Sequence, residues 1–136
     1  MKQLIHSFST GLTEIIEVPV PKVQENSLLI KSRMSLLSSG TEKMLVDFGK
    51  ANYFEKARQQ PDKLKEVIDK SLTDGILSTA EAVKSKLNTP LGLGYSNVGT
   101  VLKVGKSVRG FKVGDRVVSN GPHAEVFNVS KNLCVK

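Results

Sequence analysis

Hydroxyl and carboxylate side chains gather in the stretch SSGTEKML, residues 38–45. The Thr41 hydroxyl can both donate and accept a hydrogen bond, and the carboxyl group of Glu42 follows it directly. The stretch contains no cysteine, no histidine and no nucleophile with a base beside it. Two interpretations are therefore open. Either this is an active-site corner that lacks a metal, or it is a helix start that Thr41 caps and Glu42 stabilises through the helix dipole.

Other residues that commonly bind metals or act as nucleophiles are few. Cys134 is the single cysteine, which excludes an internal disulfide and a cysteine-based zinc site. We expect Cys134 to be buried and inert on a short apolar strand. We expect His6 and His123 to be strand residues rather than ligands, and Asp115 and Arg116 to stabilise a turn.

Five stretches predict β-strands, because they are rich in Ile, Val and Leu and are separated by proline or glycine: 12–18, 28–37, 98–104, 116–119 and 124–129. Many short strands with glycine turns are typical of a barrel or a sandwich. In the stretch SLLIKSRMSLL, alternation places Leu28, Ile30, Met34 and Leu36 on one face.

Residues 41–88 predict helices that interrupt the strands. A first helix starts at Thr41 and stops at Gly49, and a second starts at Pro61. The second helix and a third one that ends before Pro90 each carry an apolar stripe: Leu64, Val67, Ile68 and Leu72 on the second, and Leu72, Ile76, Ala80, Val83 and Leu87 on the third. We expect these stripes to make core contacts.

Length and composition favour one globular domain. The 136 residues are 39% hydrophobic and 24% charged, which suffices for one core. The net charge of +7 is concentrated in residues 87–136, which hold seven basic and two acidic residues. We expect a basic solvated surface and no nucleic-acid partner, because neither interleaved aromatics nor a DNA-binding motif accompanies this charge.

The sequence does not predict a membrane or secreted protein. No apolar run approaches the roughly 20 residues that span a bilayer. The N-terminal residues lack the apolar core of a secretory signal. We therefore expect a cytoplasmic protein without a membrane partner.

Residues 92–136 carry the most informative motifs. They contain GYS at 94–96, GTVLKVGKSVRGFKVGDRV at 99–117 and HAE at 123–125. These closely resemble the medium-chain dehydrogenase/reductase family, the zinc alcohol dehydrogenases and quinone reductases. That family has a Gly-His-Glu corner, a strand of the form GxVxxVGxxVxxFKxGDRV and a YAEY strand. The residues that match the long motif in order are Gly99, Val101, Val104, Gly105, Val108, Phe111, Lys112, Gly114, Asp115, Arg116 and Val117.

The same resemblance places residues 39–42, SGTE, at the family's Cys-Gly-Thr-Asp corner. In the family, these two corners give a cysteine and a histidine to the catalytic zinc. Here Ser39 replaces the cysteine, Tyr95 the histidine and Ser96 the glutamate. A serine hydroxyl and a phenol are poor ligands beside a thiolate and an imidazole, so we expect no zinc. The loop for the family's four-cysteine structural zinc is also missing.

The resemblance implies roles for single residues. Thr41 aligns with the hydroxyl residue that passes a proton to the substrate alcohol, and Tyr95 could donate a hydrogen bond to a substrate carbonyl in place of zinc. We therefore expect Thr41 and Tyr95 to be catalytic, and Ser39, Glu42 and Ser96 to bind substrate. Plainer alternatives stay open: a helix cap for Thr41, a helix-start carboxylate for Glu42 and a packed aromatic for Tyr95.

The resemblance also implies a fold, mainly β with an α insertion: a GroES-like β-barrel with an inserted helical hairpin at about residues 50–88. In the family, a Rossmann domain that binds NAD(P) follows this barrel. No Gly-x-Gly-x-x-Gly occurs between a strand and a helix in residues 1–136. We expect these residues to form the substrate-side domain, with the cofactor bound by a domain outside this chain.

Two functions are consistent with these observations. One is the substrate-side domain of a zinc-independent NAD(P)-dependent oxidoreductase that acts on a small carbonyl, alcohol or activated alkene; the isolated chain is then expected to be inactive. The alternative is a non-catalytic GroES-like binding module. Self-association into a homo-oligomer stays open. The helical segment lies in sequence between the Thr41 and Tyr95 corners, so we predict that it walls the substrate cleft.

Overall fold

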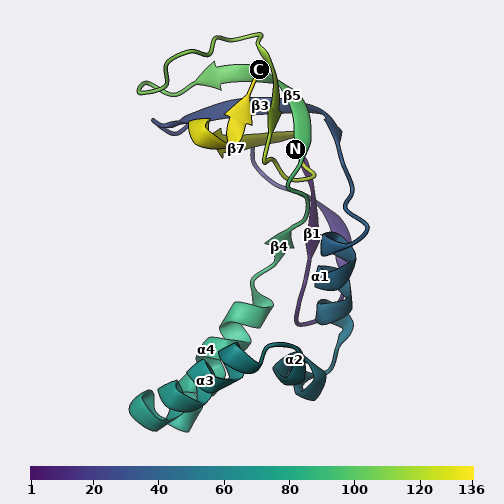
Figure 1. Ribbon diagram of the computed structural model, residues 1–136, viewed down its shortest axis with the longest axis vertical. Helices are drawn as coiled ribbons and strands as arrows, with labels where there is room; N and C mark the ends of the chain where they lie inside the picture. Colours follow the sequence, from purple (N-terminus) through teal and green to yellow (C-terminus); the bar gives the residue numbers. More distant parts are fainter. The chain divides into compact units, whose positions relative to one another are not determined.

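The computed structural model describes residues 1–136, which form two compact units. The first unit contains Met1–Ile5, Glu14–Glu42 and Gly92–Lys136. The second contains His6–Thr13 and Lys43–Leu91. Four elements contribute residues to both units: the strands β1 (Lys2–His6) and β2 (Thr13–Glu17), the helix α1 (Thr41–Lys50) and the two-residue strand Leu91–Gly92 (Figure 1).

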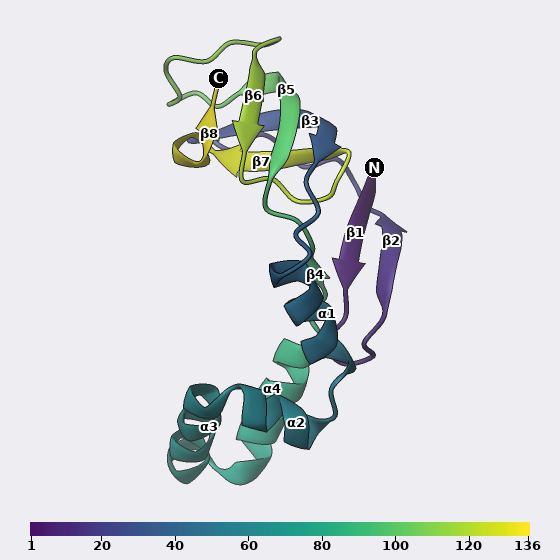
Figure 2. The ribbon, with the colours of Figure 1, turned by 45° about the vertical axis from the view of Figure 1, so that its right-hand side comes forward.

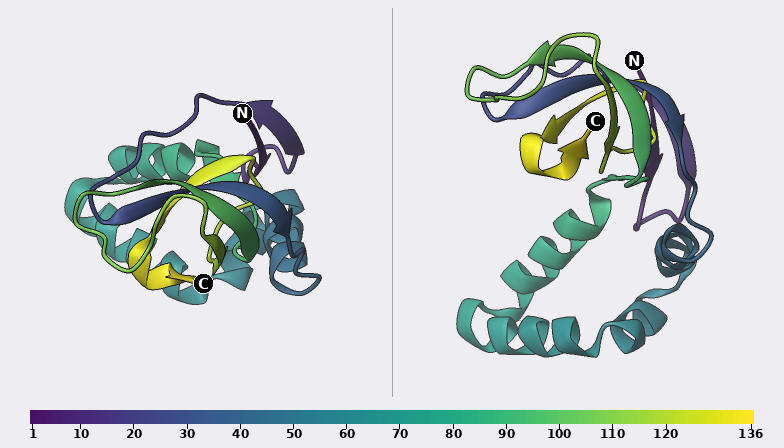
Figure 3. Two further views of the ribbon diagram at one scale, coloured as in Figure 1. Left: turned by 90° about the horizontal axis from the view of Figure 1, so that it is seen from above. Right: turned by 45° about the horizontal axis from the view of Figure 1, so that its top comes forward.

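An antiparallel sheet of order β7-β3-β5-β6-β8 forms most of the first unit. The long strands curve in Figures 2 and 3, so the sheet curls around its inner face. A smaller sheet has the order β2-β1-β4. The strands not yet bounded are β3 (Ser27–Ser35), β4 (Leu91–Gly92), β5 (Asn97–Val104), β6 (Arg116–Ser119), β7 (Val126–Ser130) and β8 (Cys134–Val135).

The hydrophobic core fills the inner face of the curled sheet. Its buried members are Leu28, Ile30, Val101, Val108, Val117, Phe127, Val129 and Cys134. Buried and exposed residues alternate along β6 and β7, as expected for strands with one face inward. Gly99 allows β5 to approach β3 closely, because a Cβ there would lie 2.4 Å from Ile30 Cγ2. The predicted barrel-like fold is confirmed.

β3 departs from simple alternation. Leu28, Leu29 and Ile30 are all buried, whereas Met34 and Leu36 are each 70% exposed. The register against β5 shifts between Leu29 and Ile30 and again between Ser32 and Met34. Such irregularities re-aim the side chains that follow them. The prediction that Met34 and Leu36 share a face with the core residues is therefore wrong.

Near the C-terminus, Asp115 and Cys134 behave as predicted, whereas Arg116 does not stabilise the turn. Asp115 accepts a hydrogen bond from the Lys112 N–H at 2.9 Å and lies 2.9 Å from Lys136 Nζ. Arg116 begins β6, where it is paired with Thr100, and its exposed side chain makes no hydrogen bond or ion pair. Cys134 is buried, and burial raises the pKa of its thiol, which disfavours the reactive thiolate.

Helices form most of the second unit: α2 (Tyr53–Gln59), α3 (Pro61–Asp74) and α4 (Ile76–Asn88), with the end of α1. α3 and α4 contact each other (Figure 3), which confirms the predicted hairpin. Gly75, with φ of 91°, turns the chain between them. α2 was not predicted, although Asn52 and Glu55 form a capping box at its start. None of the helices is long and apolar enough to cross a membrane.

The apolar stripes of the hairpin are not buried. Leu72 is 82% and Ile76 is 80% exposed; α3 has no buried residue, and α4 buries only Thr79. The predicted core contacts are therefore wrong. Within this unit α3 packs mainly on α2 and α4, so no further layer covers the outer sides of the helices.

Candidate functional site

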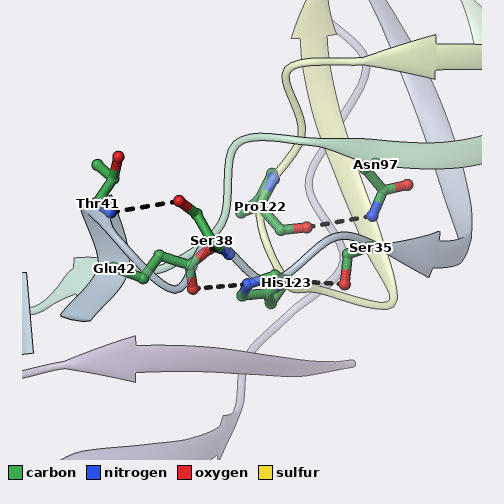
Figure 4. A network of polar contacts seen from close by, with 7 residues as sticks. All are labelled: Ser35, Ser38, Thr41, Glu42, Asn97, Pro122 and His123. Atoms are coloured by element: carbon green, nitrogen blue, oxygen red, sulfur yellow. Dashed lines mark hydrogen bonds and ion pairs between the residues drawn. The ribbon is translucent and has the colours of Figure 1, made fainter.

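The turn from β3 into α1 is fixed by two hydrogen bonds. The Thr41 N–H donates to Ser38 Oγ at 3.3 Å, and the Ser38 N–H donates to Glu42 Oε1 at 3.0 Å (Figure 4). Ser38 thus satisfies one of the N–H groups that a helix start leaves without an intrahelical partner. Thr41 is the first helical residue, so the predicted cap at Thr41 is wrong and its hydroxyl is not used for capping.

Glu42 is a buried carboxylate, only 3% exposed. Its second oxygen, Oε2, lies 2.9 Å from His123 Nε2. A buried carboxylate requires hydrogen-bond donors, and Ser38 and His123 supply one each. The interpretation of Glu42 as a helix-start carboxylate is confirmed, and its contact with His123 is an addition that the sequence did not suggest.

His123 lies in the bend before β7, so its predicted strand position is wrong. Its Nδ1 is 2.7 Å from Ser35 Oγ. When Glu42 is ionised it only accepts hydrogen bonds, so Nε2 carries a hydrogen and a neutral imidazole accepts from the Ser35 hydroxyl at Nδ1. Sequence reasoning named His123 but missed its contact with Glu42, because 81 positions separate the two residues. The only sequence feature that drew attention to His123 was the HAE motif at 123–125.

Two neighbours brace the His123 bend. A Cβ on Gly94, which has φ of 93°, would lie 2.5 Å from the His123 backbone nitrogen, so this close approach requires glycine. Asn97, only 1% exposed, donates from Nδ2 to the Pro122 carbonyl at 3.3 Å and to Ser32 Oγ at 2.8 Å. The bend is therefore held against the start of β5.

Tyr95 follows Gly94 and is 46% exposed. The side chain of Ser38, and next that of Thr41, lower the pKa of the Tyr95 phenol below its ordinary value, while partial burial and the charge of Glu42 oppose them. We call Ser38, Thr41 and Tyr95 the hydroxyl cluster. The structure brings together the two residues predicted to be catalytic and adds Ser38, which the sequence analysis did not single out.

Two other residues predicted to bind substrate, Ser39 and Ser96, are sequence neighbours of the hydroxyl cluster. Ser39 is exposed in the turn before α1. Ser96 is partly buried, and its carbonyl accepts a hydrogen bond from the Leu36 N–H at 2.9 Å. This bond ties the Tyr95 corner to the residues that follow β3.

An open groove of about 830 Å³ borders the same histidine. Ser32, Ser35, His123 and Glu125 are among its lining residues, but Thr41 and Tyr95 are not. The hydroxyl cluster therefore lies at a surface and not in this groove.

The donor set at this site does not fit zinc. No three His, Cys, Asp or Glu side chains are grouped to hold a metal, and the two strongest ligands present, Glu42 and His123, bond to each other. The hydroxyl cluster offers only neutral oxygen donors where zinc prefers thiolate, imidazole or carboxylate. Zinc independence rests on this chemistry and stays a prediction.

Solved structures share the fold of the chain. Quinone oxidoreductase from Coxiella burnetii matches with a TM-score of 0.64 and 21% identity, over 100% of this chain and 36% of that chain. Galactitol-1-phosphate dehydrogenase from Escherichia coli matches with 0.63 and 14%, over 99% and 37%. Escherichia coli quinone oxidoreductase, complexed with NADPH, matches with 0.59 and 16%, over 99% and 32%. The chain thus spans about a third of each of these proteins.

Comparison with curated proteins gives no significant match. In contrast, the family model described as the alcohol dehydrogenase GroES-like domain matches residues 68–136, slightly more than half of the chain. The matched residues include the Tyr95 corner, the Asp115 turn and the His123 bend. The chain therefore belongs to the alcohol dehydrogenase GroES-like domain family, within the medium-chain dehydrogenases/reductases.

Proposed function

We propose that this chain is the substrate-side domain of a zinc-independent NAD(P)-dependent oxidoreductase, in which the hydroxyl cluster binds the oxygen of a carbonyl substrate. The observation that carries the proposal is that His123 joins the two corners: its Nε2 lies 2.9 Å from Glu42, which follows Thr41, and its backbone packs against Gly94, which precedes Tyr95. Membership of the family supports the reaction class. The NADPH named for one structural neighbour supports the cofactor class.

Carbonyl reduction requires a hydride at the carbon and a proton at the oxygen. NAD(P)H, bound by a domain outside this chain, would supply the hydride. The chain's own residues would stabilise the negative charge that develops on the carbonyl oxygen. A phenol of lowered pKa donates a stronger hydrogen bond and gives up its proton more readily than an ordinary one. The Ser38 and Thr41 hydroxyls would then stabilise the phenolate that remains.

The three residues predicted to bind substrate differ in burial, and we therefore give them different roles. Ser39 is exposed and stands two residues before Thr41, so it is available to the rest of a substrate. Ser96 adjoins Tyr95 but is partly buried. Glu42 is almost fully buried, so its part in binding is indirect and passes through Ser38.

The substrate class is an electron-poor carbonyl or an alkene conjugated with one. A neutral phenol is a weaker electrophile than a zinc ion, so it suits substrates that accept hydride readily. Quinones belong to this class, and two of the structural neighbours are quinone oxidoreductases.

The complete gene product, with whatever follows Lys136 in its reading frame, provides the test. Oxidation of NADPH and of NADH is measured with a panel of quinones, enones and aldehydes. Tyr95→Phe should lower kcat by about 10²–10³-fold, the usual effect of losing one oxyanion donor. Tyr53→Phe changes the only other tyrosine and should leave kcat unchanged. No turnover with any acceptor, or a fully active Tyr95→Phe protein, would refute the proposal.

A non-catalytic binding module remains the second candidate. The exposed apolar side chains of the helices favour it, among them Phe54 at 79%, Leu72 at 82% and Ile76 at 80% exposed. A complete gene product that neither binds NAD(P)H nor oxidises it would favour this second function.

A further inference from the structure

A serine, a histidine and a carboxylate form a hydrogen-bonded series at the edge of the open groove. Ser35 Oγ lies 2.7 Å from His123 Nδ1, and His123 Nε2 lies 2.9 Å from Glu42 Oε2. Figure 4 shows the imidazole of His123 between Glu42 and Ser35. A histidine that contacts a serine hydroxyl and is itself held by a carboxylate is the arrangement that activates serine as a nucleophile.

The tautomer of His123 is the one that a base requires. The ionised Glu42 carboxylate only accepts hydrogen bonds, so Nε2 carries the hydrogen and the lone pair of Nδ1 faces the Ser35 hydroxyl. The Glu42 side chain is 4% and the His123 side chain 11% exposed, so water does not readily replace either partner. The imidazole is therefore held in the state that can take a proton from Ser35.

Ser35 is exposed and lines the groove of about 830 Å³ together with Ser32 and His123. In a regular strand, residues three apart point to opposite faces of the sheet. The register of β3 shifts between Ser32 and Met34, and such an irregularity re-aims the side chains beyond it. Both serines can therefore face the same groove.

Ser32 offers a hydrogen-bond donor beside this nucleophile. Its Oγ accepts a hydrogen bond at 2.8 Å from Nδ2 of Asn97, which is only 1% exposed. Because the Ser32 oxygen is the acceptor in that bond, its own hydroxyl hydrogen stays free to donate. A fixed hydroxyl donor can stabilise the negative oxygen that forms when a carbonyl carbon is attacked.

The groove also has apolar lining residues, among them Leu4, Ile15, Val20 and Val126. Ligand pockets of several hundred Å³ commonly combine such apolar walls with a few polar groups that fix the orientation of the ligand. These walls favour a substrate whose acyl group is mainly apolar.

We propose that Ser35 is a nucleophile that takes the acyl group of esters of small, mainly apolar carboxylic acids. Its Oγ forms a bond to the carbonyl carbon while its proton moves to His123 Nδ1. The ester C–O bond then breaks, and His123 gives this proton to the departing alcohol. Water attacks the acyl group on Ser35 in the same way, which releases the carboxylic acid and restores the Ser35 hydroxyl. This activity goes beyond the proposed reductase function and needs no NAD(P)H.

Hydrolysis of p-nitrophenyl butyrate by the complete gene product, without nicotinamide cofactor, tests the proposal. His123→Gln should lower kcat/KM by about 10²–10⁴-fold, the usual contribution of a general base. Ser35→Ala should lose at least as much. Ser107→Ala changes an exposed serine between β5 and β6, outside the groove, and should leave the rate unchanged. Hydrolysis that Ser35→Ala does not lower would overturn the proposal.

Covalent labelling gives a second measurement that needs no stable variant. A fluorophosphonate probe, which reacts with activated serines, should modify Ser35 of the unaltered protein, as located by mass spectrometry of its peptides. Labelling should be lost in His123→Gln and kept in Ser107→Ala. A protein that carries no label at Ser35 would overturn the proposal.

Glu42 is a positioning residue in this account, and Glu42→Gln tests that role. Its Oε1 accepts from the Ser38 N–H at 3.0 Å, so a glutamine that keeps this bond turns its NH₂ group toward His123 Nε2. Nε2 must then accept, and the imidazole hydrogen moves to Nδ1, where it blocks proton uptake from Ser35. Nitrogen NMR of the imidazole should show this change of tautomer, with a hydrolysis rate lowered about 10²-fold or more. A changed tautomer with the parent rate would overturn the role of His123 as the base.

The two proposed activities can fail separately. Ester hydrolysis that depends on Ser35, without NAD(P)H oxidation with any acceptor, would refute the proposed function alone. NAD(P)H oxidation that depends on Tyr95, with no reaction at Ser35, would refute the nucleophile alone.

Discussion

The two units of this chain use their apolar residues in opposite ways. In the first, the apolar residues of five strands converge on one core, and Leu28 and Ile30 are fully buried. In the second, the helices α3 and α4 carry apolar stripes of the right period, yet Leu72 and Ile76 stay exposed. A periodic pattern therefore predicts which element forms, but burial also needs a second layer that the pattern does not describe.

The largest expected difference in the free energy of unfolding is between alanine substitutions of two isoleucines, one in each unit. Ile30→Ala removes a fully buried side chain and should lower the free energy of unfolding by about 2–5 kcal/mol. Ile76→Ala removes one that is 80% exposed and should change it by less than about 0.5 kcal/mol. Urea denaturation of both variants measures the two values. Equal losses would show that the helical stripe is buried in solution.

Matched glycines test the close strand packing of the first unit. Gly99→Ala would place a Cβ 2.4 Å from Ile30 Cγ2 and 2.6 Å from the Lys31 carbonyl oxygen, so we expect a loss of about 1–3 kcal/mol. Gly40→Ala meets no atom within 4 Å, so its thermal unfolding should match the parent. A neutral Gly99→Ala would contradict the tight β3–β5 contact.

The second unit has a buried polar group of its own, His6. It is fully buried, its Nδ1 lies 2.8 Å from Thr13 Oγ1, and Nε2 has no partner. Desolvation, and then the charges of Lys50 and Lys56, lower the pKa of His6 below 6.5 in the folded chain. Because the unfolded histidine takes up a proton first, the stability from neutral His6 is complete above pH 6.5 and is lost progressively below it.

Denaturation should therefore give a lower free energy of unfolding at about pH 5 than at about pH 8, and part of this difference should depend on His6. His6→Leu should reduce that loss. His123→Gln, which changes the other histidine, keeps His6 and should retain this contribution. If the parent and His6→Leu lose the same free energy of unfolding at acid pH, neutral His6 does not contribute to stability as we expect.

Of all these changes, removal of the helices should have the smallest effect on the fold of the first unit. We expect a chain in which a short linker replaces residues 50–88 to keep the barrel-like fold, as judged by amide NMR shifts of the strands. In the complete gene product, the same deletion should change the substrate preference. A chain that fails to fold would show that the helices belong to the core, and an unchanged substrate profile would refute their role in selectivity.

Sequence reasoning predicted most of the fold because the strand residues are strongly periodic and the long glycine-rich motif is specific. It missed α2, whose only signal is the Asn52–Glu55 capping box. It also placed Met34 and Leu36 on the core face, since register shifts within β3 leave no mark in the pattern.

The candidate site was predicted only in part. Thr41 and Tyr95 could be found from their places in two motifs. Ser38 and His123 could not, because their roles depend on hydrogen bonds and on a contact over 81 residues. A tertiary contact between single polar residues has no period, so it appears only when the chain is folded.

Titration of Tyr95 in the Tyr53→Phe chain tests the central claim most directly, because it asks whether the hydroxyl cluster exists in solution. The account predicts a midpoint below the ordinary phenol value of about 10, and a rise toward that value in the Ser38→Ala and Thr41→Val variants. A midpoint at the ordinary value that neither substitution moves would contradict it.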